Sequence, residues 1–356
     1  MKPELESLPL AEVERLAERV ADPAAWNYLV SGAGTEDALR ENLAAFRRIR
    51  FAPRVCTDVS EVDTELRLLG LDLPHPVLIG PTACHRMFHP DGEEATARGA
   101  GEAGAVFCLS GYSTTGMAAV QRAASGPWWL QYNAAPDDGF TRELIAEATE
   151  RGAAGIVLTV DTPVAGARER QGWDGVSLPD GLSFALTESA PYPVRPPSSP
   201  YEIHRPALDA SFTWERLAGL RSSTRIPLLV KGILRADDAL RCLDAGADGI
   251  IVSNHGARNL DSVLSTAEAL PRVAEAVRGR AAVLVDGGLR RGADIAKALA
   301  LGADAVLLGR PALHGLVLAG AQGVGHVVRR LRYELAMTMA LCGAPNLAAL
   351  DADLLV

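Results

Sequence analysis

The stretch 253–261, SNHGARNLD, directly follows an apolar run, GIIV, and places two polar groups of different chemistry three residues apart. His255 has an imidazole that can take up or release a proton near neutral pH. Arg258 has a guanidinium that stays charged, and Gly256 lies between the two. Charged side chains are seldom fully buried without a partner. Such groups at the end of a buried strand therefore raise the question of what they act on.

Hydrogen-bonding residues also stand at the ends of most other apolar segments. Asp161 and Lys231 are two of these residues. Together with His255, at one mouth of the fold, they indicate a functional site. Each has a structural alternative, because Asp161 could cap a turn and a lone histidine is more often a satisfied structural group. A buried, unpaired lysine costs several kcal/mol, so Lys231 needs a specific anion beside it. The other polar or small residues at segment ends are Pro81, Thr82, Ser110, Gln131, Thr159, Ser253, Asn254, Asp286, Gly309 and Arg310.

The elements that must position these residues follow a repeating pattern. A helix end, a Gly-Ala turn and a short apolar strand recur in similar form, and the apolar runs lack period-two alternation, which suits parallel strands covered on both faces. Eight β-α units indicate a TIM (β/α)8 barrel. A doubly wound sheet is the alternative, but the glycine-rich dinucleotide turn is missing after the first strand. The predicted strands are 76–83, 105–110, 128–133, 155–161, 227–233, 249–255, 282–288 and 305–310.

Two regions lie outside this repeat within a single predicted domain, 1–356. The N-terminal extension, 1–75, contains two helical patterns and is expected to cover the bottom or flank of the barrel. The segment 172–212 is rich in proline and lacks periodicity. A long irregular insertion in a compact barrel is usually a lid or a mobile active-site loop, so we expect a lid after the fourth strand. Helices are predicted between strands, for example over 91–104 and 235–246.

Composition excludes several other classes of protein. The 356 residues have 48% hydrophobic content and a formal net charge of −9, so nucleic acid is not an expected partner. No stretch of about 18 apolar residues predicts a membrane span, and the charged N-terminus does not resemble a signal peptide. Five scattered cysteines fit neither a disulfide framework nor a zinc site. His85 and His89 have helical spacing but no cluster of carboxylates, so no metal is expected. A cytoplasmic protein is the default.

The last two predicted strands are followed by segments suited to a phosphate. TIM barrels often bind phosphate with the loops after strands seven and eight, and here those loops read DGGLRRG (286–292) and LGRP (308–311). Gly287 and Gly288 let backbone N–H groups approach an anion. Arg290 and Arg310 can add charge. With polar residues at most other strand ends, this indicates an elongated phosphorylated ligand across the barrel mouth, and flavin mononucleotide (FMN) has that shape.

From about residue 26 to 345 the chain resembles the FMN-dependent 2-hydroxy acid oxidase/dehydrogenase family, which includes glycolate, lactate and mandelate or hydroxymandelate oxidases. The most specific match is SNHG-x-R-x-LD (253–261) with DGG-x-R-x-G (286–292) downstream. The other matching stretches are YLVSGAGTEDALRENLAAFRRIRFAPRV, PTACHRMFHPDGEEATARGA, LTVDTPVAGARER, LVKGIL, the segment 286–311 and ELAMTMALCG.

The resemblance implies roles for the polar residues. His255 would be the catalytic base that takes a proton from the substrate's α-carbon or hydroxyl, and Asp161 would stabilise its imidazolium form. Arg258, Tyr28 and Arg168 would hold the substrate carboxylate.

The resemblance also implies the residues that bind the cofactor. Lys231 would lie near flavin N1, and the flavin would be the anion that its burial requires. Positions around the isoalloxazine ring and ribityl chain would be Pro81, Thr82, Ala83, Ser110, Gln131, Thr159 and Ser253. The ribityl and phosphate grip would comprise Asp286, Gly287, Gly288, Leu289, Arg290, Gly309 and Arg310.

Three positions depart from the family pattern. The third strand usually reads Gln-x-Tyr with both side chains inward, but here it reads LQYN. Strand alternation puts Asn133 in the place of the tyrosine and turns Tyr132 outward, whereas a bulge could bring Tyr132 back. Ala165 stands where a larger residue is common, and Tyr112 where glycolate oxidases have tryptophan. The changes at Ala165 and Tyr112 indicate a 2-hydroxy acid bulkier than glycolate, aromatic acids included.

Two other functions are compatible with the residues. Lys231 could form a Schiff base in a flavin-free lyase or aldolase, or the barrel could bind FMN without catalysis. The family resemblance favours oxidation of an (S)-2-hydroxy acid to the 2-oxo acid. O2 is the expected electron acceptor, although another acceptor is an alternative, and a homo-oligomer, a tetramer by resemblance, is expected.

Overall fold

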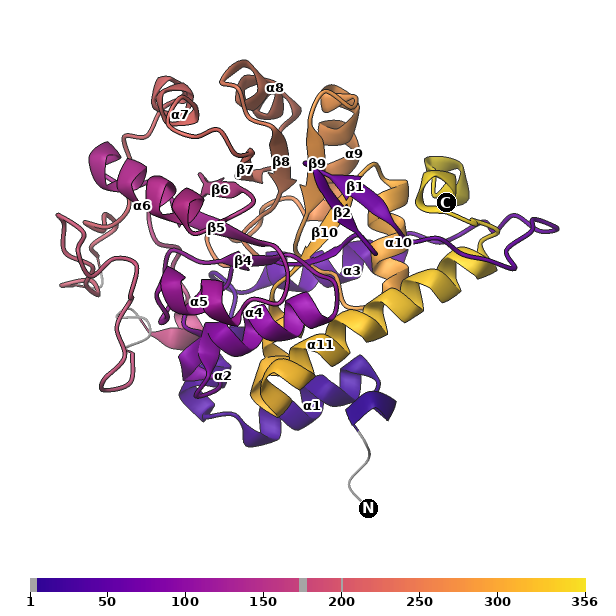
Figure 1. Ribbon diagram of the computed structural model, residues 1–356, viewed down its shortest axis with the longest axis horizontal. Coiled ribbons are helices and arrows are strands. Elements are labelled where there is room, and N and C mark those ends of the chain that lie inside the picture. Colours follow the sequence, from indigo (N-terminus) through magenta and orange to yellow (C-terminus); the bar gives the residue numbers. More distant parts are fainter. Residues whose placement is uncertain (1–4, 173–177, 200) are drawn as a thin grey trace.

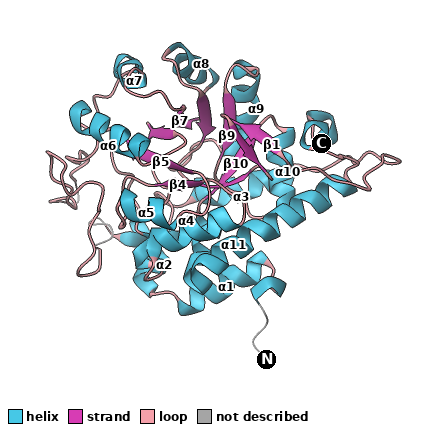
Figure 2. Cartoon of the chain, viewed as in Figure 1, coloured by secondary structure: helices cyan, strands magenta, loops and turns pink. Residues whose placement is uncertain are grey.

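Eight parallel strands close into a barrel in the computed structural model, which describes residues 5–172, 178–199 and 201–356 (Figures 1 and 2). Their order around the barrel is β10-β3-β4-β5-β6-β7-β8-β9. The predicted TIM barrel is confirmed and the open doubly wound sheet is wrong. The strands are β3 (Val77–Ile79), β4 (Phe107–Leu109), β5 (Trp128–Asn133), β6 (Ile156–Thr159), β7 (Leu228–Ile233), β8 (Gly249–Val252), β9 (Ala282–Val285) and β10 (Ala305–Leu308).

Helices lie around the outside of the barrel, as Figure 2 shows in cyan. Local signals fix several of their starts: the Asp137 carboxylate accepts the Phe140 N–H of α6, and Glu268 accepts the Ser265 N–H at the start of α9. The helices predicted over 91–104 and 235–246 are confirmed as α4 and α8. The barrel helices are α4 (Gly92–Glu102), α5 (Met117–Ala123), α6 (Asp138–Glu150), α7 (Trp214–Arg221), α8 (Ala236–Asp244), α9 (Thr266–Val277), α10 (Gly292–Ala300) and α11 (Arg310–Leu341).

The core has two layers, and the apolar strands contribute to both. Alternate residues of every strand point into the barrel, while the residues between them pack against the helices. Both faces of each strand are thus covered, which is why the sequence shows continuous apolar runs. Each strand supplies one residue to the middle of the inner layer: Leu78, Cys108, Trp129, Val157, Leu229, Ile251, Leu284 and Leu307.

The N-terminal extension contributes to both ends of the barrel. Strands β1 (Leu66–Leu68) and β2 (Leu71–Leu73) form a hairpin whose Leu68 and Leu73 join the inner layer. Helix α1 (Leu10–Val20) packs along α11, and α3 (Asp37–Arg48) contacts α9 and α10 (Figure 1). Helix α2 (Pro23–Val30) reaches the mouth instead, because carbonyl groups at its C-terminus accept hydrogen bonds from arginines there.

The lid predicted over 172–212 lacks α-helix and strand over its described residues, 172, 178–199 and 201–212, and residues 173–177 and 200 lie outside the described part. Backbone hydrogen bonds tie it to the barrel mouth, with Ala185 N–H donating to Ser113 O (2.9 Å) and Asp209 N–H donating to Ala134 O (3.2 Å).

Across the residues that the structure describes, no helix is both long and apolar enough to cross a membrane. Short 3₁₀ turns cover Leu5–Ser7, His85–Met87, Glu169–Gln171, Leu347–Ala349 and Ala352–Leu354.

The contact between α4 and α11 leaves no room for a side chain at Gly99, where an added Cβ would lie 2.2 Å from Ala321 O. We expect Gly99→Ala to lower the free energy of unfolding by about 1–3 kcal/mol or more, since overpacking forces the backbone apart. Gly219→Ala, in α7, is the matched control because nothing lies within 4 Å of its Cβ position; there alanine should stabilise the helix slightly. Urea unfolding measures both. Equal midpoints for Gly99→Ala and the wild type would contradict this close helix contact.

Candidate active site

The carboxyl ends of the barrel strands open into one cavity of about 1180 Å³. Nearly all of the residues predicted to form a site line it, although they come from segments spread over almost 300 positions. Asp161 and Ser253 are the exceptions and lie behind the wall. The predicted residues in the wall are Tyr28, Pro81, Thr82, Ala83, Ser110, Gln131, Thr159, Arg168, Lys231, His255, Arg258, Asp286, Gly287, Gly288, Leu289, Arg290, Gly309 and Arg310.

The turn after β8 has an unusual backbone that brings His255 and Arg258 to the cavity. His255, Gly256 and Ala257 have φ values of +57°, +62° and +60°, a left-handed run that side chains other than glycine seldom adopt. The buried side chain of Asn254 holds this turn: its Oδ1 accepts the Ala257 N–H (3.1 Å), and its Nδ2 donates to Asn42 Oδ1 (2.7 Å) on α3. Such local strain persists only where the surroundings fix it, and it is common at functional sites.

His255 is paired with Asp161 through a hydrogen bond of 2.9 Å between Nδ1 and Oδ1. Burial alone would raise the pKa of the Asp161 carboxyl, but the neighbouring His255 imidazole, followed by Lys231, brings this pKa below its ordinary value. The ionised carboxylate therefore accepts the Nδ1–H, which leaves Nε2 as the nitrogen that can act as a base. Asp161 is held in turn by Asn259, whose Nδ2 donates to the Asp161 carbonyl (2.9 Å).

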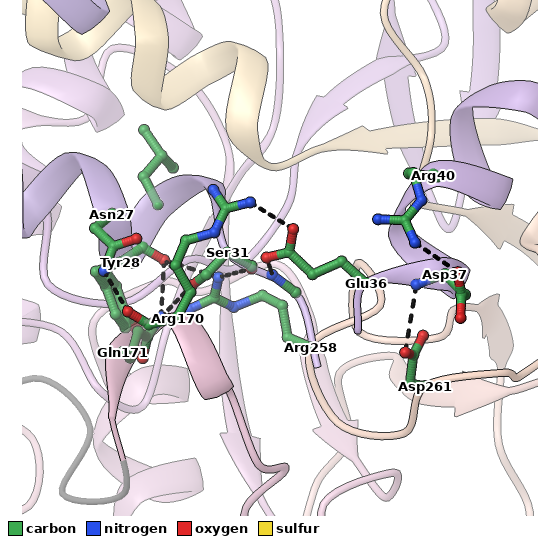
Figure 3. Close-up of polar contacts among 12 residues, drawn as sticks. Asn27, Tyr28, Ser31, Glu36, Asp37, Arg40, Arg170, Gln171, Arg258 and Asp261 are labelled. Carbon is green, nitrogen blue, oxygen red and sulfur yellow. Dashed lines mark hydrogen bonds and ion pairs between the residues drawn. The ribbon is translucent and has the colours of Figure 1, made fainter. Parts of the chain in front are cut away.

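Two guanidinium groups lie side by side at one end of the cavity. Arg258 Nη1 donates to the carbonyls of Tyr28 (2.8 Å) and Ser31 (2.7 Å), and its guanidinium carbon lies 4.8 Å from the centre of the Tyr28 ring (Figure 3). Arg168 Nε donates to the Arg258 carbonyl (3.3 Å). Burial, followed by the charge of Arg258, lowers the pKa of Arg168 to about 10. A carboxylate placed here would relieve this repulsion.

Polar contacts around this end lock α2 and α3 to the turn after β8. Arg170 pairs with Glu36, and the Glu36 carboxylate also accepts the Gly32 N–H (2.9 Å), as Figure 3 shows. Asp261 accepts the Ala38 N–H (2.8 Å) at the start of α3, and this bond is the main cause that lowers the pKa of the Asp261 carboxyl to about 2. The aspartate that ends the SNHG-x-R-x-LD stretch thus serves to cap a helix of the N-terminal extension.

Lys231 has a protein carboxylate as its partner. Its Nζ lies 3.1 Å from Asp286 Oδ2 and donates to Ser253 Oγ (2.8 Å). Burial lowers the pKa of Lys231, but Asp286 and Asp161 more than offset it, so the pKa is raised. Asp286 is thus an anion beside Lys231 that the sequence did not identify, and the place of Lys231 near flavin N1 stays a prediction. Ser253, which the sequence placed beside the flavin, also accepts the His255 N–H (3.0 Å) and supports the site from beneath.

The end of the cavity formed by the segments after β9 and β10 has the features expected of a phosphate grip, and it adjoins Arg258, because Arg310 and Arg258 donate to the same Ser31 carbonyl. Arg290 is half-buried there, and burial is the main cause that lowers its pKa. Arg310 donates to the carbonyls of Leu29 (3.0 Å), Gly256 (3.1 Å) and Ser31 (3.1 Å), and burial followed by the neighbouring arginines lowers its pKa. Helix α11 begins at Arg310, so its first N–H groups face this end. An anionic group bound here would offset the repulsion, and the phosphate of FMN fits these donors.

On strand β5 the alternation from the sequence is confirmed. The strand pairs with β6 in unbroken register from Leu130 to Asn133, so no bulge reverses the faces. Asn133 lines the cavity, while Tyr132 packs in the outer core layer and its buried hydroxyl has no partner among the described residues.

Sequence reasoning missed the outer wall of the cavity. The lid supplies apolar and aromatic side chains there, and the Tyr112 ring meets the Phe184 ring edge-on at 5.3 Å. No periodicity in the lid could have identified them. Within the described ranges, no three His, Cys, Asp or Glu side chains are grouped to hold a metal ion. The wall residues not predicted include Cys84, Thr162, Leu182, Phe184, Tyr192 and Leu208.

Comparison with known proteins gives a consistent result. Residues 17–356 match a family model described as FMN-dependent dehydrogenase. The chain is 42% identical to an L-lactate oxidase of Nostoc sp. (strain PCC 7120 / SAG 25.82 / UTEX 2576), with 97% of each chain covered. It is 40% identical to a peroxisomal (S)-2-hydroxyacid oxidase of Arabidopsis thaliana, covering 94% of this chain and 93% of the relative. A solved mandelate oxidase with (S)-2-phenylpropionate superposes with a TM-score of 0.87 at 36% identity, covering 98% of this chain and 97% of that one.

The half-buried arginines of the phosphate grip predict that anions stabilise the cofactor-free protein. We expect inorganic phosphate to raise the melting temperature of FMN-free protein, because a ligand at 100 times its Kd adds about 2.7 kcal/mol. Arg290→Gln should remove most of this shift, while the neighbouring Arg291→Gln, half-exposed and paired with Asp294, should keep it. Thermal unfolding across a phosphate series measures the shift. An equal shift in both variants would place the anion elsewhere.

Proposed function

The chain belongs to the FMN-dependent dehydrogenase family and is an FMN-dependent 2-hydroxy acid oxidase, and from this premise we propose that its substrate is bulkier than glycolate and carries an aromatic group. The observation that carries the proposal is the cavity itself. At about 1180 Å³ it exceeds the roughly 300–1000 Å³ of typical single-ligand pockets, which leaves space for a large substrate beside the cofactor.

The part of the cavity away from the phosphate grip has an apolar, aromatic wall. Tyr112 and Phe184 meet edge-on, Tyr192 lies in the same wall, and Ala165 and Asn133 are short where the family usually has larger side chains. Aromatic rings favour this edge-to-face arrangement with one another. The mandelate oxidase with (S)-2-phenylpropionate, a ligand with a phenyl group, supports the same substrate class.

We assign the acid–base and binding roles to this chain's own side chains. Bound FMN supplies the acceptor for the two electrons that leave the substrate. Arg258 and Arg168, with Tyr28 beside them, hold the substrate carboxylate and so fix the α-carbon. His255 Nε2 takes the proton that the substrate loses, and the Asp161 carboxylate stabilises the resulting imidazolium.

Lys231 acts as a fixed positive charge in this proposal. A lysine that forms a Schiff base must first be a neutral amine, whereas Asp286 and Asp161 raise the pKa of Lys231 and keep it protonated. This disfavours the lyase or aldolase alternative. The relatives are named oxidases, which supports O2 as the acceptor that restores the cofactor.

The substrate proposal is tested by kinetics on the FMN-loaded enzyme. We expect kcat/KM for (S)-mandelate to exceed that for glycolate by at least tenfold, because burying a phenyl group contributes about 2–3 kcal/mol. Anaerobic flavin bleaching with each acid, followed by admission of oxygen, measures the reaction and its acceptor. A preference for glycolate would refute the bulky-substrate proposal.

His255→Asn serves as the catalytic control in the same experiment. It should keep the yellow, FMN-bound state and lose flavin bleaching by roughly 100-fold or more, the usual contribution of a general base. If bleaching survives at the wild-type rate, His255 is not the base. If the wild-type protein binds FMN and no 2-hydroxy acid bleaches it, the chain would be a non-catalytic FMN-binding barrel.

We also propose that the protein works as a cytoplasmic homo-oligomer, a tetramer by its resemblance. Tyr333, Met337 and Leu341 are exposed at four-residue spacing, which forms an apolar stripe on α11. The five cysteines are free, as suits a reducing compartment. Sedimentation equilibrium should give a multiple of the 37.5 kDa chain mass, reduced by Leu341→Arg. A monomer mass for the wild type would refute the oligomer.

A further inference from the structure

Asn133 is fixed in one orientation by its neighbours at the mouth of the barrel. Gln131 Nε2 donates to Asn133 Oδ1 (2.7 Å) and also to Thr159 Oγ1 (2.9 Å), so both hydrogens of the Gln131 amide are used. The Asn133 oxygen must therefore face Gln131, which turns Nδ2 toward Thr162, where it donates to Oγ1 (2.6 Å). The amide cannot flip without losing both bonds.

One hydrogen of the Asn133 amide is left for the cavity. An amide nitrogen carries two hydrogens, and within the residues that the structure describes Thr162 Oγ1 is the acceptor of Asn133 Nδ2. Asn133 lies in the cavity wall together with His255 and Arg258. The remaining N–H is therefore a directed donor in the same chamber as the base and the carboxylate clamp.

The backbone around Asn133 keeps this donor in place. Strand β5 pairs with β6 up to Asn133, and Ala134 N–H donates to Thr159 O (3.1 Å) just beyond it. The lid returns to the barrel at the same point, where Asp209 N–H donates to Ala134 O (3.2 Å). Asn133 thus lies between a rigid strand end and an anchored end of the lid, so its position does not depend on the lid's irregular middle.

The chemistry of the substrate matches such a donor. A 2-hydroxy acid and its 2-oxo product both carry an oxygen on the α-carbon, and the product's carbonyl oxygen can only accept a hydrogen bond. The carboxylate is held by arginines and the proton is taken by His255, so the α-oxygen is the group that still needs a donor. Because a side-chain amide does not titrate, this donor is present at every pH at which the protein folds.

We propose that Asn133 determines substrate specificity by donating its remaining Nδ2–H to the oxygen on the substrate's α-carbon, while its short side chain leaves space for a bulky substituent. Thr162 is its positioning residue. This inference rests on the proposed oxidation of a bulky 2-hydroxy acid and identifies the residue that selects that substrate.

The test compares two ligands that differ at the α-oxygen. Benzoylformate carries the oxygen, and (S)-2-phenylpropionate has a methyl group there; neither is a 2-hydroxy acid, so neither is oxidised during the measurement. Their dissociation constants for the FMN-loaded protein are measured from the change in the visible flavin spectrum. Asn133→Ala should raise the dissociation constant of benzoylformate about tenfold, the usual effect of one hydrogen bond. It should change the dissociation constant of (S)-2-phenylpropionate by less than about twofold.

Variants of Thr162 test whether its hydroxyl orients the Asn133 amide, without removing Asn133 itself. Thr162→Ser keeps the hydroxyl and should bind benzoylformate as the wild type does, whereas Thr162→Val should weaken it in the same direction as Asn133→Ala. Asn133→Tyr tests whether the short side chain leaves space for the aromatic ring. It should weaken the binding of benzoylformate and leave the binding of pyruvate, which lacks the ring, unchanged. Equal melting temperatures for these proteins guard against a loss of fold.

The outcomes separate this inference from the proposed function. If Asn133→Ala weakens both aromatic ligands equally or neither of them, the α-oxygen contact is refuted while the oxidase function stands. If Asn133→Tyr binds benzoylformate as the wild type does, the size role is refuted. If the wild-type protein binds no 2-oxo acid at all, the bulky-substrate function and this inference are both overturned.

Discussion

The site depends on the left-handed turn after β8 and on the buried amide of Asn254 that holds it. The strand alone could deliver His255 to the mouth, but not turn its Nδ1 to Asp161 and bring Arg258 to the same chamber. Asn254 does this by joining the Ala257 N–H of the turn to Asn42 on α3. Helix α3 is in turn capped by Asp261, so turn and helix hold each other. The N-terminal extension is thereby part of the active site.

A second constraint is electrostatic. Arg168, Arg258, Arg290 and Arg310 share one cavity. Burial lowers the pKa of Arg168, Arg290 and Arg310, and repulsion from the other cavity arginines adds to this for Arg168 and Arg310. A cavity with four arginines suits ligands that bring two anionic groups, a phosphate near Arg290 and Arg310 and a carboxylate near Arg168 and Arg258. Lys231 is different, because the Asp286 carboxylate lies 3.1 Å from its Nζ and helps to keep it protonated.

The sequence predicted the fold and most of the site because strand ends are encoded locally. The apolar runs that end near Thr159, Lys231 or His255 can be recognised from neighbouring residues alone. The two-residue alternation of side chains along a strand is enough to place Asn133 inward. Partners across the barrel could not be read in this way. From the sequence alone the flavin is the anion assigned to Lys231, because nothing local links this lysine to Asp286. The resemblance puts Ser253 beside the flavin, because the left-handed turn that follows it is a tertiary effect that no motif reveals. The aromatic lid wall has no period to reveal it.

The most direct test is a crystal structure of the FMN-loaded protein with benzoylformate. We expect the ligand carboxylate between Arg258 and Arg168, and the α-carbon about 3–3.5 Å from His255 Nε2, the separation of a reactive complex. The phenyl group should face Tyr112 and Phe184. A carboxylate bound at Arg290 instead, or a His255 ring turned away from the ligand, would contradict the assignment of base and clamp to the one turn after β8.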